Sequence, residues 1–511
     1  MDILPAYPAW LIEHGAALAV VLPLLTGAVC AVLRSERAAW IVTLIVTGAC
    51  AVVSFGVLLT IFAGEVQIYE MGGWEPPYGI AYVIDGLNAP VLFLISAIAF
   101  IGTLYGIPSV TAEVEPGKRA PFYGAFLLCV AGLLGMVVTG DAFNVFVFLE
   151  VSSISTYVLV AMGASRDRRA LAAACRYLIL GSIGATLFVV GVGCLYMETG
   201  TLNMLDMSRI LSEIGGGSRV ALVGFGFIVI GLGLKLAMFP LHLWLPGAYA
   251  HAPSFVTVFL ASTATKAALY LLLRFMFVVF DPSFEYDTAI ITYVITTVAV
   301  AGMLLASLQA VYQTDARRTL AYSSIAQVGY MLLGIGMATA AGLSAGYLHL
   351  INHALIKGAL FLALGAFWYR YGIMRVLDFR GLGQIMPWTM GAFTLGGLSL
   401  IGVPFTAGFV SKYNLAMAAA ANGWWWAVGV IMAASVLAII YMGRMLLVAY
   451  FQPPPEVDGE AVAKNEAPLL MLVPMWVLAG LSILIGINAD WIVHAADGAA
   501  MVLTAGGGVR P

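Results

Sequence analysis

The chain has 511 residues, of which 62% are hydrophobic and only 10% are charged, and its formal net charge is −3. A soluble domain carries about 25% charged residues, so this composition excludes a soluble globular protein and indicates one that crosses a membrane many times. No basic stripe lies outside the short loops, which argues against nucleic acid as a partner. The five cysteines are scattered through apolar stretches without a CxxC pair, and we interpret them as packing residues.

Fourteen apolar stretches are long enough to cross a lipid bilayer, and they predict an all-α polytopic membrane fold. They cover about 15–33, 39–63, 87–106, 120–139, 142–163, 170–197, 220–245, 254–280, 288–312, 319–338, 342–369, 387–421, 424–450 and 467–488. The N-terminal residues lack the basic region of a signal peptide, so we expect the first stretch to be retained.

The distribution of lysine and arginine between alternate loops predicts the orientation of these stretches. If the N-terminus lies outside, thirteen basic residues fall in inward loops: Arg34, Arg37, Lys118, Arg119, Arg166, Arg168, Arg169, Arg317, Arg318, Arg370, Arg375, Arg380 and Lys464. Only three fall outside, namely Arg209, Arg219 and Arg510. The outward loop 64–86 and connection 281–287 carry acidic residues without any base. We therefore expect a bacterial inner-membrane protein with both termini on the outer side.

Two stretches contain a proline that should interrupt a helix. Pro240 follows Lys235 by five residues and, because proline has no amide donor, leaves the carbonyl of Leu236 without its helical partner. The stretch 387–421 is too long for one straight crossing, and its GVPFTAG segment places Pro404 between two glycines. A broken helix at membrane depth is tolerated only where protein or a water-filled cavity surrounds it. Such a break beside a buried cation indicates part of an ion path.

A faint internal repeat relates two groups of five stretches. SSISTYVLV at 152–160 is matched by SSIAQVGYM at 323–331, and GATLF at 184–188 is matched by KGALF at 357–361. Five crossings separate the copies, so the second is inverted relative to the first, as in many transporters. Two short matches in so apolar a chain can also arise by chance. We divide the chain into N-terminal helices at 1–118, repeats at 119–280 and 281–450, and a linker, last helix and tail at 451–511.

Ionisable residues in the middle of the first repeat are candidates for function. A lysine at the bilayer centre costs roughly 2.5–3.5 kcal/mol on insertion scales, so Lys235 and Lys266 should each have a partner or a task. Glu150 lies about nine residues into its stretch, where desolvation disfavours the charged form of a lone carboxyl. Beside Lys235 both groups could be charged and stabilise each other. The alternative for Glu150 is a polar packing contact with Ser152 or Ser153.

His349, His353 and Lys357 lie at positions i, i+4 and i+8 of HLINHALIK, which places them on one face of a helix, about 6 Å apart. Histidine titrates near pH 6.5 and can both donate and accept a proton, as a relay requires. A lone buried histidine is more often a packing residue, but three basic groups on one face favour a relay. A metal site is disfavoured, because no carboxylate or cysteine shares that face.

Further candidates lie near the breaks and the ends of stretches. Lys412, in AGFVSKYNL, follows the second break; the alternative is a lysine that extends to the interface. His242 and His251, in PLHLWLPGAYAHAP near the inner mouth, could take up protons or cap a turn. The remaining charges are expected to be helix caps (Asp85, Asp141) or to extend to the interface (Arg176, Arg274, Arg444).

The sequence contains no motif for nucleotide hydrolysis or electron transfer, the usual energy sources of an ion pump. It contains no GxGxxG at a strand-to-helix turn, no GxxxxGK and no cysteine cluster for an iron–sulfur centre. We therefore expect no cofactor, no metal and no catalysis by this chain alone. Its energy would come from an ion gradient or from partner subunits.

These residues together resemble the antiporter-like subunits shared by Mrp-type multisubunit Na+/H+ antiporters, respiratory complex I and membrane-bound hydrogenases. The resemblance covers roughly residues 85–450 and rests on Glu150, Lys235 before FPLHLWLPGAYAHAPS, Lys266, the His349/His353/Lys357 face and Lys412. Within that superfamily, MGGWEPPYGIAYVIDGLNAP at 71–90 is similar to the corresponding part of the Mrp-type D subunits, and the chain length also fits those subunits.

The resemblance implies a proton path that crosses half the membrane and then runs along its midplane. Glu150 and Lys235 would form a switchable ion pair, and the proton of Lys235 would pass by Lys266 to the histidines and Lys357. Lys412 would be the terminal carrier, and partner subunits would couple the movement to Na+ efflux. Three other interpretations are a proton-pumping subunit of complex I or a hydrogenase, a scaffold whose buried charges only specify packing, and a solitary transporter. The last is disfavoured, because the sequence has no obvious substrate-pocket signature.

Overall fold

The computed structural model describes residues 7–214, 218–280, 290–457, 460–461 and 464–505. In the first half, the helices are α1 (Ala9–Glu13), α2 (Gly15–Val32), α3 (Glu36–Phe62), α4 (Ala89–Glu113), α5 (Arg119–Val138), α6 (Ala142–Ala161), α7 (Arg169–Thr199), α8 (Met204–Ile214), α9 (Arg219–Leu236), α10 (Leu245–His251), α11 (Ser254–Ser262) and α12 (Ala264–Arg274). In the second half, they are α14 (Thr296–Ala301), α15 (Ser307–Tyr312), α16 (Ala316–Gly336), α17 (Ala340–Tyr371), α18 (Leu382–Ile385), α19 (Pro387–Ile401), α20 (Ala407–Ala421), α21 (Trp425–Phe451), α22 (Leu469–Ile487) and α23 (Asp490–Thr504). Strands β1 (Gln67–Glu70) and β2 (Ala81–Ile84) form one antiparallel hairpin, and β3 (Glu456–Val457) and β4 (Glu460–Ala461) form another.

Twelve helical segments of the described residues are long and apolar enough to cross a membrane. Each of the fourteen predicted stretches contains helix, because α16 and the broken pair α19 and α20 add to the twelve segments. The all-α membrane fold is therefore confirmed, whereas the total of fourteen crossings stays a prediction. The acidic connection 281–287 and Arg510, on which the predicted orientation partly rests, lie outside the described residues.

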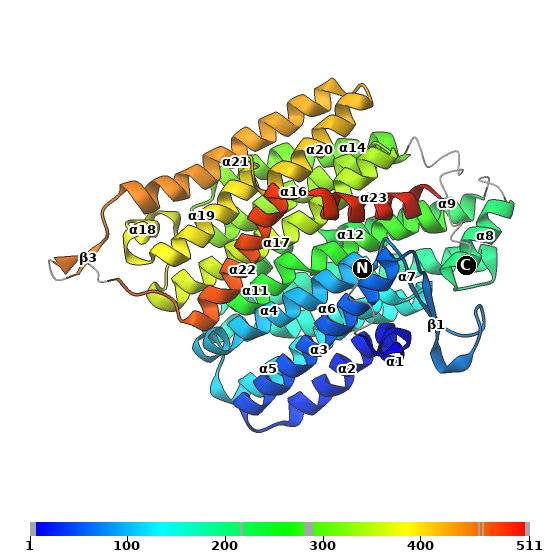
Figure 1. Cartoon of the computed structure of the whole chain (residues 1–511), viewed down its shortest axis with the longest axis horizontal. Helices are drawn as coiled ribbons and strands as arrows, with labels where there is room; N and C mark the ends of the chain where they lie inside the picture. The colour runs from blue at the N-terminus through cyan, green and yellow to red at the C-terminus, as the bar shows by residue number, and fades with distance from the viewer. Residues whose placement is uncertain (1–6, 215–217, 281–289, 458–459, 462–463, 506–511) are drawn as a thin grey trace.

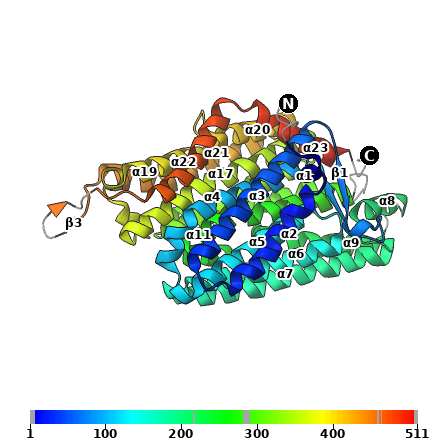
Figure 2. The same cartoon turned by 60° about the horizontal axis from the view of Figure 1, so that its bottom comes forward.

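Helix α17 occupies the middle of the bundle (Figures 1 and 2). It packs against α11, α16, α19, α20 and α22, and its most apolar 18-residue window is completely buried. The N-terminal α2 and α3 lie on one side of it in Figure 1 and α21 lies on the other, while β3 projects from one end of the bundle. Because protein surrounds α17, polar residues on its faces meet other side chains and backbone instead of lipid.

Two helices are interrupted where prolines predict it. Helix α9 ends at Leu236, and Ala237 takes a left-handed conformation with φ of 59° before a turn leads to α10. Helix α19 ends at Ile401, and Gly402 follows with φ of 94°, which costs glycine little. The hydroxyl of Thr406 then caps α20 by accepting the amide of Phe409. Both breaks leave helix termini inside the protein.

A third interruption was not predicted. Helix α11 ends at Ser262 and α12 begins at Ala264, because Thr263 leaves helical geometry with φ of −126° and ψ of −53°. No proline or glycine marks this position. The stretch predicted at 288–312 also contains π-helical turns at Ile290–Ile295 and Gly302–Ala306, a feature frequent at functional sites.

A buried ion pair fixes the C-terminal end of α12. Arg274 is 5% exposed and donates two hydrogen bonds to the carboxylate of Asp85, at 2.6 and 2.9 Å. The prediction that Arg274 extends to the interface was wrong, because Asp85 supplies a carboxylate inside the protein. Asp85 is also not the N-cap of α4, which is Asn88; one of its oxygens accepts the amides of Leu87 and Asn88 in the turn before the helix.

Candidate functional site

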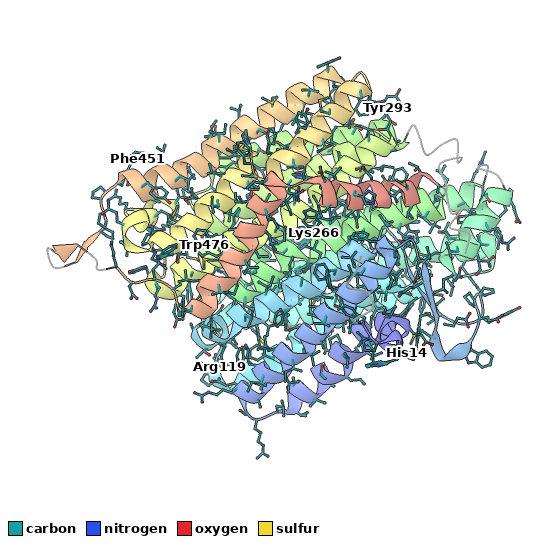
Figure 3. All side chains as sticks on the ribbon, viewed as in Figure 1. His14, Arg119, Lys266, Tyr293, Phe451 and Trp476 are labelled. Atoms are coloured by element: carbon teal, nitrogen blue, oxygen red, sulfur yellow. The ribbon has the colours of Figure 1, made fainter. Side chains whose placement is uncertain are left out.

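The predicted ionisable residues gather in the interior of the bundle. Lys266 lies in the middle of the view in Figure 3, far from labelled residues of the periphery such as Arg119 and Phe451. Its exposed fraction is 1%, that of Lys357 is 0% and that of Lys412 is 6%. Burial of so many cationic side chains is expensive, so each must be stabilised by the groups around it.

Lys235 lies in the last turn of α9 and faces α6. Its ammonium donates hydrogen bonds to the hydroxyls of Ser153 and Tyr157, and it lies 5.7 Å from the centre of the Tyr157 ring. The ion pair predicted between Lys235 and Glu150 is not formed, since their charged atoms are not within 4.0 Å of each other. Lys235 is instead bonded to Ser153, which is about 4.5 Å further along the same face of α6.

The carboxylate of Glu150 is correspondingly under-satisfied. Its buried oxygen Oε1 has no hydrogen-bond partner in the described part of the chain. The alternative of a packing contact with Ser152 or Ser153 is also absent, because both hydroxyls donate to the carbonyl of Leu149. A small movement of the lysine along α6 would therefore exchange a hydroxyl partner for a carboxylate.

A small cavity adjoins Lys235 on the side of α12. Its volume is about 30 Å³, and Lys235, Ser153, Ala264 and Ala268 are among its lining residues. A water needs about 10–15 Å³ of such volume, so the cavity can hold one or two. Ala264 and Ala268 lie on the face of α12 opposite Lys266, because two residues span more than half a helical turn. The cavity thus reaches α12 without opening on Lys266.

Lys266 lies directly after the third helix break. Its ammonium donates to the carbonyl of Ala261 at 2.5 Å and to the hydroxyl of Thr265 at 3.3 Å. The Ala261 carbonyl belongs to the last turn of α11, where the helix dipole favours a cation. The break therefore supplies the neutral acceptor that stabilises a buried lysine.

The basic face of α17 points into the protein, as predicted. The two ring nitrogens of His349 lie 2.8 Å from Ser411 Oγ and 2.8 Å from Gln327 Oε1. Its ring is nearly parallel to that of His353, with ring centres 6.2 Å apart. Lys357 donates to the carbonyl of Leu320 at 2.9 Å and to the hydroxyl of Ser323.

His353 differs from its neighbours, because neither of its buried ring nitrogens has a hydrogen-bond partner among the residues that the structure describes. An unsatisfied buried polar group costs about 1–3 kcal/mol. The two ring nitrogens are thus not committed to other protein groups, as a proton relay requires.

Replacing His353 with phenylalanine tests this explanation. We expect His353→Phe to leave the unfolding temperature unchanged or slightly raised, because an apolar ring replaces an unsatisfied one, and to abolish proton transport. Thermal unfolding of the purified protein and proton uptake by membrane vesicles measure the two effects. His349→Phe is the matched variant, and it should lose stability as well, because Ser411 and Gln327 lose a partner. Normal transport by His353→Phe would contradict the relay.

Lys412 is held at the second break. It donates to the carbonyls of Leu400 and Ile401, both at 3.0 Å, and to Ser435 Oγ at 3.3 Å. These carbonyls belong to the last turn of α19, so the break again provides acceptors for a lysine. The alternative of a lysine that extends to the interface is wrong, because the side chain points inward and is almost completely buried.

Lys235 and Lys412 each lie near the ring of a tyrosine, although their hydrogen-bond acceptors differ. The nitrogen of Lys412 lies 4.7 Å from the centre of the Tyr330 ring, as that of Lys235 lies over Tyr157. Tyr157 and Tyr330 belong to the two segments, 152–160 and 323–331, that suggested the repeat. They are not equivalent positions, however, because the offset of 171 aligns Tyr157 with Val328, so the repeat stays a prediction.

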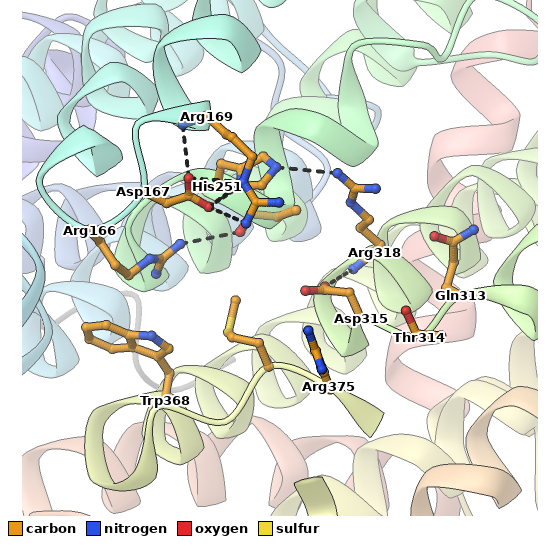
Figure 4. A pocket seen from close by; sticks show the side chains of 12 residues that line it. Arg166, Asp167, Arg169, His251, Gln313, Thr314, Asp315, Arg318, Trp368 and Arg375 are labelled. Atoms are coloured by element: carbon orange, nitrogen blue, oxygen red, sulfur yellow. Dashed lines mark hydrogen bonds and ion pairs between the residues drawn. The ribbon is translucent and has the colours of Figure 1, made fainter. Parts of the chain in front are cut away.

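The two histidines predicted to take up protons lie in different surroundings. His242 is 5% exposed, and its ring stacks on that of Phe239 in the turn between α9 and α10. His251 ends α10 and lines a pocket of about 530 Å³, where its Nδ1 lies 3.1 Å from Asp167 (Figure 4). Burial lowers the pKa of His251, and the hydrogen bond from Arg169 holds the pKa of Asp167 well below its usual value. At neutral pH a neutral imidazole therefore faces an ionised carboxylate.

Sequence reasoning missed a buried carboxylate at the end of α4. Glu113 is 3% exposed, forms an ion pair with Arg166, and accepts the backbone amide of Ser254 with both oxygens at 3.0 Å. Its charge thereby stabilises the N-terminus of α11, the helix that precedes Lys266. Arg166 counted only as a loop cation in the sequence, and nothing local indicated that it is bonded to Glu113.

Comparison with known proteins places this arrangement in a family. A family model described as NADH:quinone oxidoreductase/Mrp antiporter, TM, matches residues 139–438, which include all seven residues from Glu150 to Lys412. The chain belongs to this family. The resemblance drawn from the buried residues is therefore confirmed at the family level.

The relatives of this chain include a subunit of an NADH-quinone oxidoreductase and a subunit of a Na(+)/H(+) antiporter. The N subunit of the NADH-quinone oxidoreductase of Desulforudis audaxviator is 37% identical, over 94% of this chain and 97% of that protein. The D subunit of the Na(+)/H(+) antiporter of Alkalihalophilus pseudofirmus is 30% identical, over 86% of each chain. In the Mrp complex from Dietzia sp. DQ12-45-1b, a chain with 27% identity superposes with a TM-score of 0.87, over 96% of this chain and 97% of that one.

Proposed function

We propose that this chain is the proton-translocating component, of the D-subunit type, of a multisubunit Na+/H+ antiporter in the bacterial inner membrane, with both termini outside. The observation that carries the proposal is the series of basic residues from the half-buried Lys235 to the buried Lys412, in which each lysine is bonded to hydroxyls or carbonyls. Neutral acceptors allow a lysine to gain and lose its proton without leaving a partner charge behind. A purely structural role predicts instead that replacement of one of these lysines leaves transport unchanged in the assembled complex.

In this proposal a proton enters at His251 or His242 and reaches Lys235. When Lys235 moves from Ser153 towards Glu150, the carboxylate stabilises its charge; when it moves back, the proton can leave. Water then carries it past Lys266 to the histidines and Lys357. Lys412 releases it through the break at 402–406, and partner subunits couple the movement to Na+ export.

A second candidate is the proton-pumping membrane subunit of an NADH-quinone oxidoreductase or hydrogenase-type complex. The 37% identity to an N subunit over nearly the whole chain favours it. The buried relay would be the same in both, and only the source of energy would differ. The two candidates therefore separate through the partner subunits.

Purification of the intact complex with a tag on this chain tests the proposal. We expect the co-purifying polypeptides to be other antiporter subunits, and we expect NaCl to collapse the proton gradient of everted vesicles from cells that express the complex. Glu115→Gln, which alters an exposed carboxylate paired with Lys118, should leave this response unchanged. Co-purification of iron–sulfur proteins with no response to Na+ would favour the second candidate.

A further inference from the structure

A pocket of about 530 Å³ lies where the loop before α7, the end of α10, the start of α16 and the loop after α17 meet (Figure 4). Its charged walls carry four arginines and two aspartates besides His251: Arg166, Arg169, Arg318, Arg375, Asp167 and Asp315. With a neutral histidine the pocket has two more positive than negative charges. It is therefore suited to an anion.

Within the described ranges, two of the four arginines in the pocket are paired with carboxylates, and the other two are not. Arg166 is paired with Glu113, and Arg169 is paired with Asp167 at 2.8 Å. The other two guanidinium groups, of Arg318 and Arg375, have no carboxylate oxygen within 4.0 Å among the residues that the structure describes. The carboxylate of Asp315 is occupied with capping α16, where it accepts the amide of Arg318 at 2.9 Å.

The residues that line the pocket indicate how deep in the membrane it lies. Trp368 forms one wall, and the guanidinium of Arg166 lies 5.1 Å from the centre of its ring. Tryptophan is enriched at the membrane–water interface. Basic pockets between transmembrane helices at that level attract anionic lipid headgroups, and guanidinium groups match phosphate oxygens in pairs.

We propose that this pocket is a phosphate-binding site whose two ligands are Arg318 and Arg375. The phosphate can belong to an anionic phospholipid headgroup or to a free phosphate in solution, and both are recognised by the same chemistry. The site requires none of the proton carriers between Lys235 and Lys412. Its lining includes His251, a proposed proton entry, and Arg318 Nη2 lies 3.5 Å from His251 Nε2, so the site is tested by phosphate binding and not by transport.

Ligand binding to the delipidated complex in neutral detergent distinguishes the sources. The probes are phosphatidylglycerol, phosphatidylcholine and inorganic phosphate, with native mass spectrometry and the unfolding temperature as measurements. We expect Arg318→Gln/Arg375→Gln to weaken binding of the phosphate ligand by about tenfold or more. Arg168→Gln/Arg380→Gln removes the same charge from exposed arginines outside this pocket, and it should bind as the wild type does.

Each outcome bears on the site. Loss of phosphatidylglycerol binding in the pocket variant alone assigns a lipid, and the same pattern with inorganic phosphate alone assigns a free anion. Equal binding by pocket variant and control, or equal binding of both lipids without a phosphate effect, would overturn the site. Arg375→Gln alone serves if the double variant unfolds, because Arg375 makes no side-chain hydrogen bond or ion pair to the residues that the structure describes.

Discussion

Replacing Lys235 with alanine is expected to reduce proton-coupled transport by roughly 100-fold or more, as removal of a group that carries a proton does. The relay is serial, so no parallel group can replace the missing amine. The chain should still fold, because Ser153 keeps its own hydrogen bond to the carbonyl of Leu149 when the lysine is removed. The initial rate of proton movement in vesicles, normalised to the amount of assembled complex, measures the effect.

Two control variants decide what Lys235 does. Lys118→Ala removes an exposed lysine that is paired with Glu115, and it should leave the rate unchanged. Lys235→Arg keeps the positive charge but cannot release a proton near neutral pH, so it should be as inactive as alanine. Full transport by Lys235→Arg would mean that the residue acts through its charge alone and would rule out its role as a carrier.

Neutralising Asp85 is expected to destabilise the chain by about 3–5 kcal/mol, the cost of leaving a buried charge without its partner. In Asp85→Asn, the guanidinium of Arg274 stays buried and loses both charge-assisted hydrogen bonds. The C-terminal end of α12 and the start of α4 would no longer be fixed to each other. A lower unfolding temperature and a lower yield of assembled protein in the membrane measure this loss.

The double variant Asp85→Leu/Arg274→Met shows whether charge or shape is responsible. Most of the lost stability should return, because well-packed apolar residues often replace a buried ion pair without cost. Glu36→Gln breaks the more exposed pair with Arg119 and should cost at most about 1 kcal/mol. If Asp85→Asn is no worse than Glu36→Gln, the buried pair does not fix α12.

The membrane fold could be predicted because its main signals are local. A run of apolar residues sets each crossing, and Pro240 and Pro404 each cause a break whatever surrounds them. The break at Thr263 has no such signal, since Ser262, Thr263 and Ala264 are all compatible with helix. It depends on tertiary packing around α11 and α12, which a single sequence does not reveal.

The same division applies to the candidate site. The helical period alone placed His349, His353 and Lys357 on one face, and the structure encloses that face. Which side chains these ionisable residues contact was less predictable from the sequence. Glu150 and Ser153 lie on the same side of α6, and only the position of α9 decides which of them Lys235 contacts. The partner of Arg274 is 189 residues away along the chain.

The helix breaks at Thr263 and Gly402 have a consequence for how the site can work. A protonated amine has three N–H donors and a neutral amine still has two. Lys412 donates to the backbone carbonyls of Leu400 and Ile401, so it can keep both hydrogen bonds after deprotonation. Its nitrogen therefore need not move when its charge changes. Main-chain oxygens at the helix ends would hold the amine nitrogen in one position, and only the proton would move.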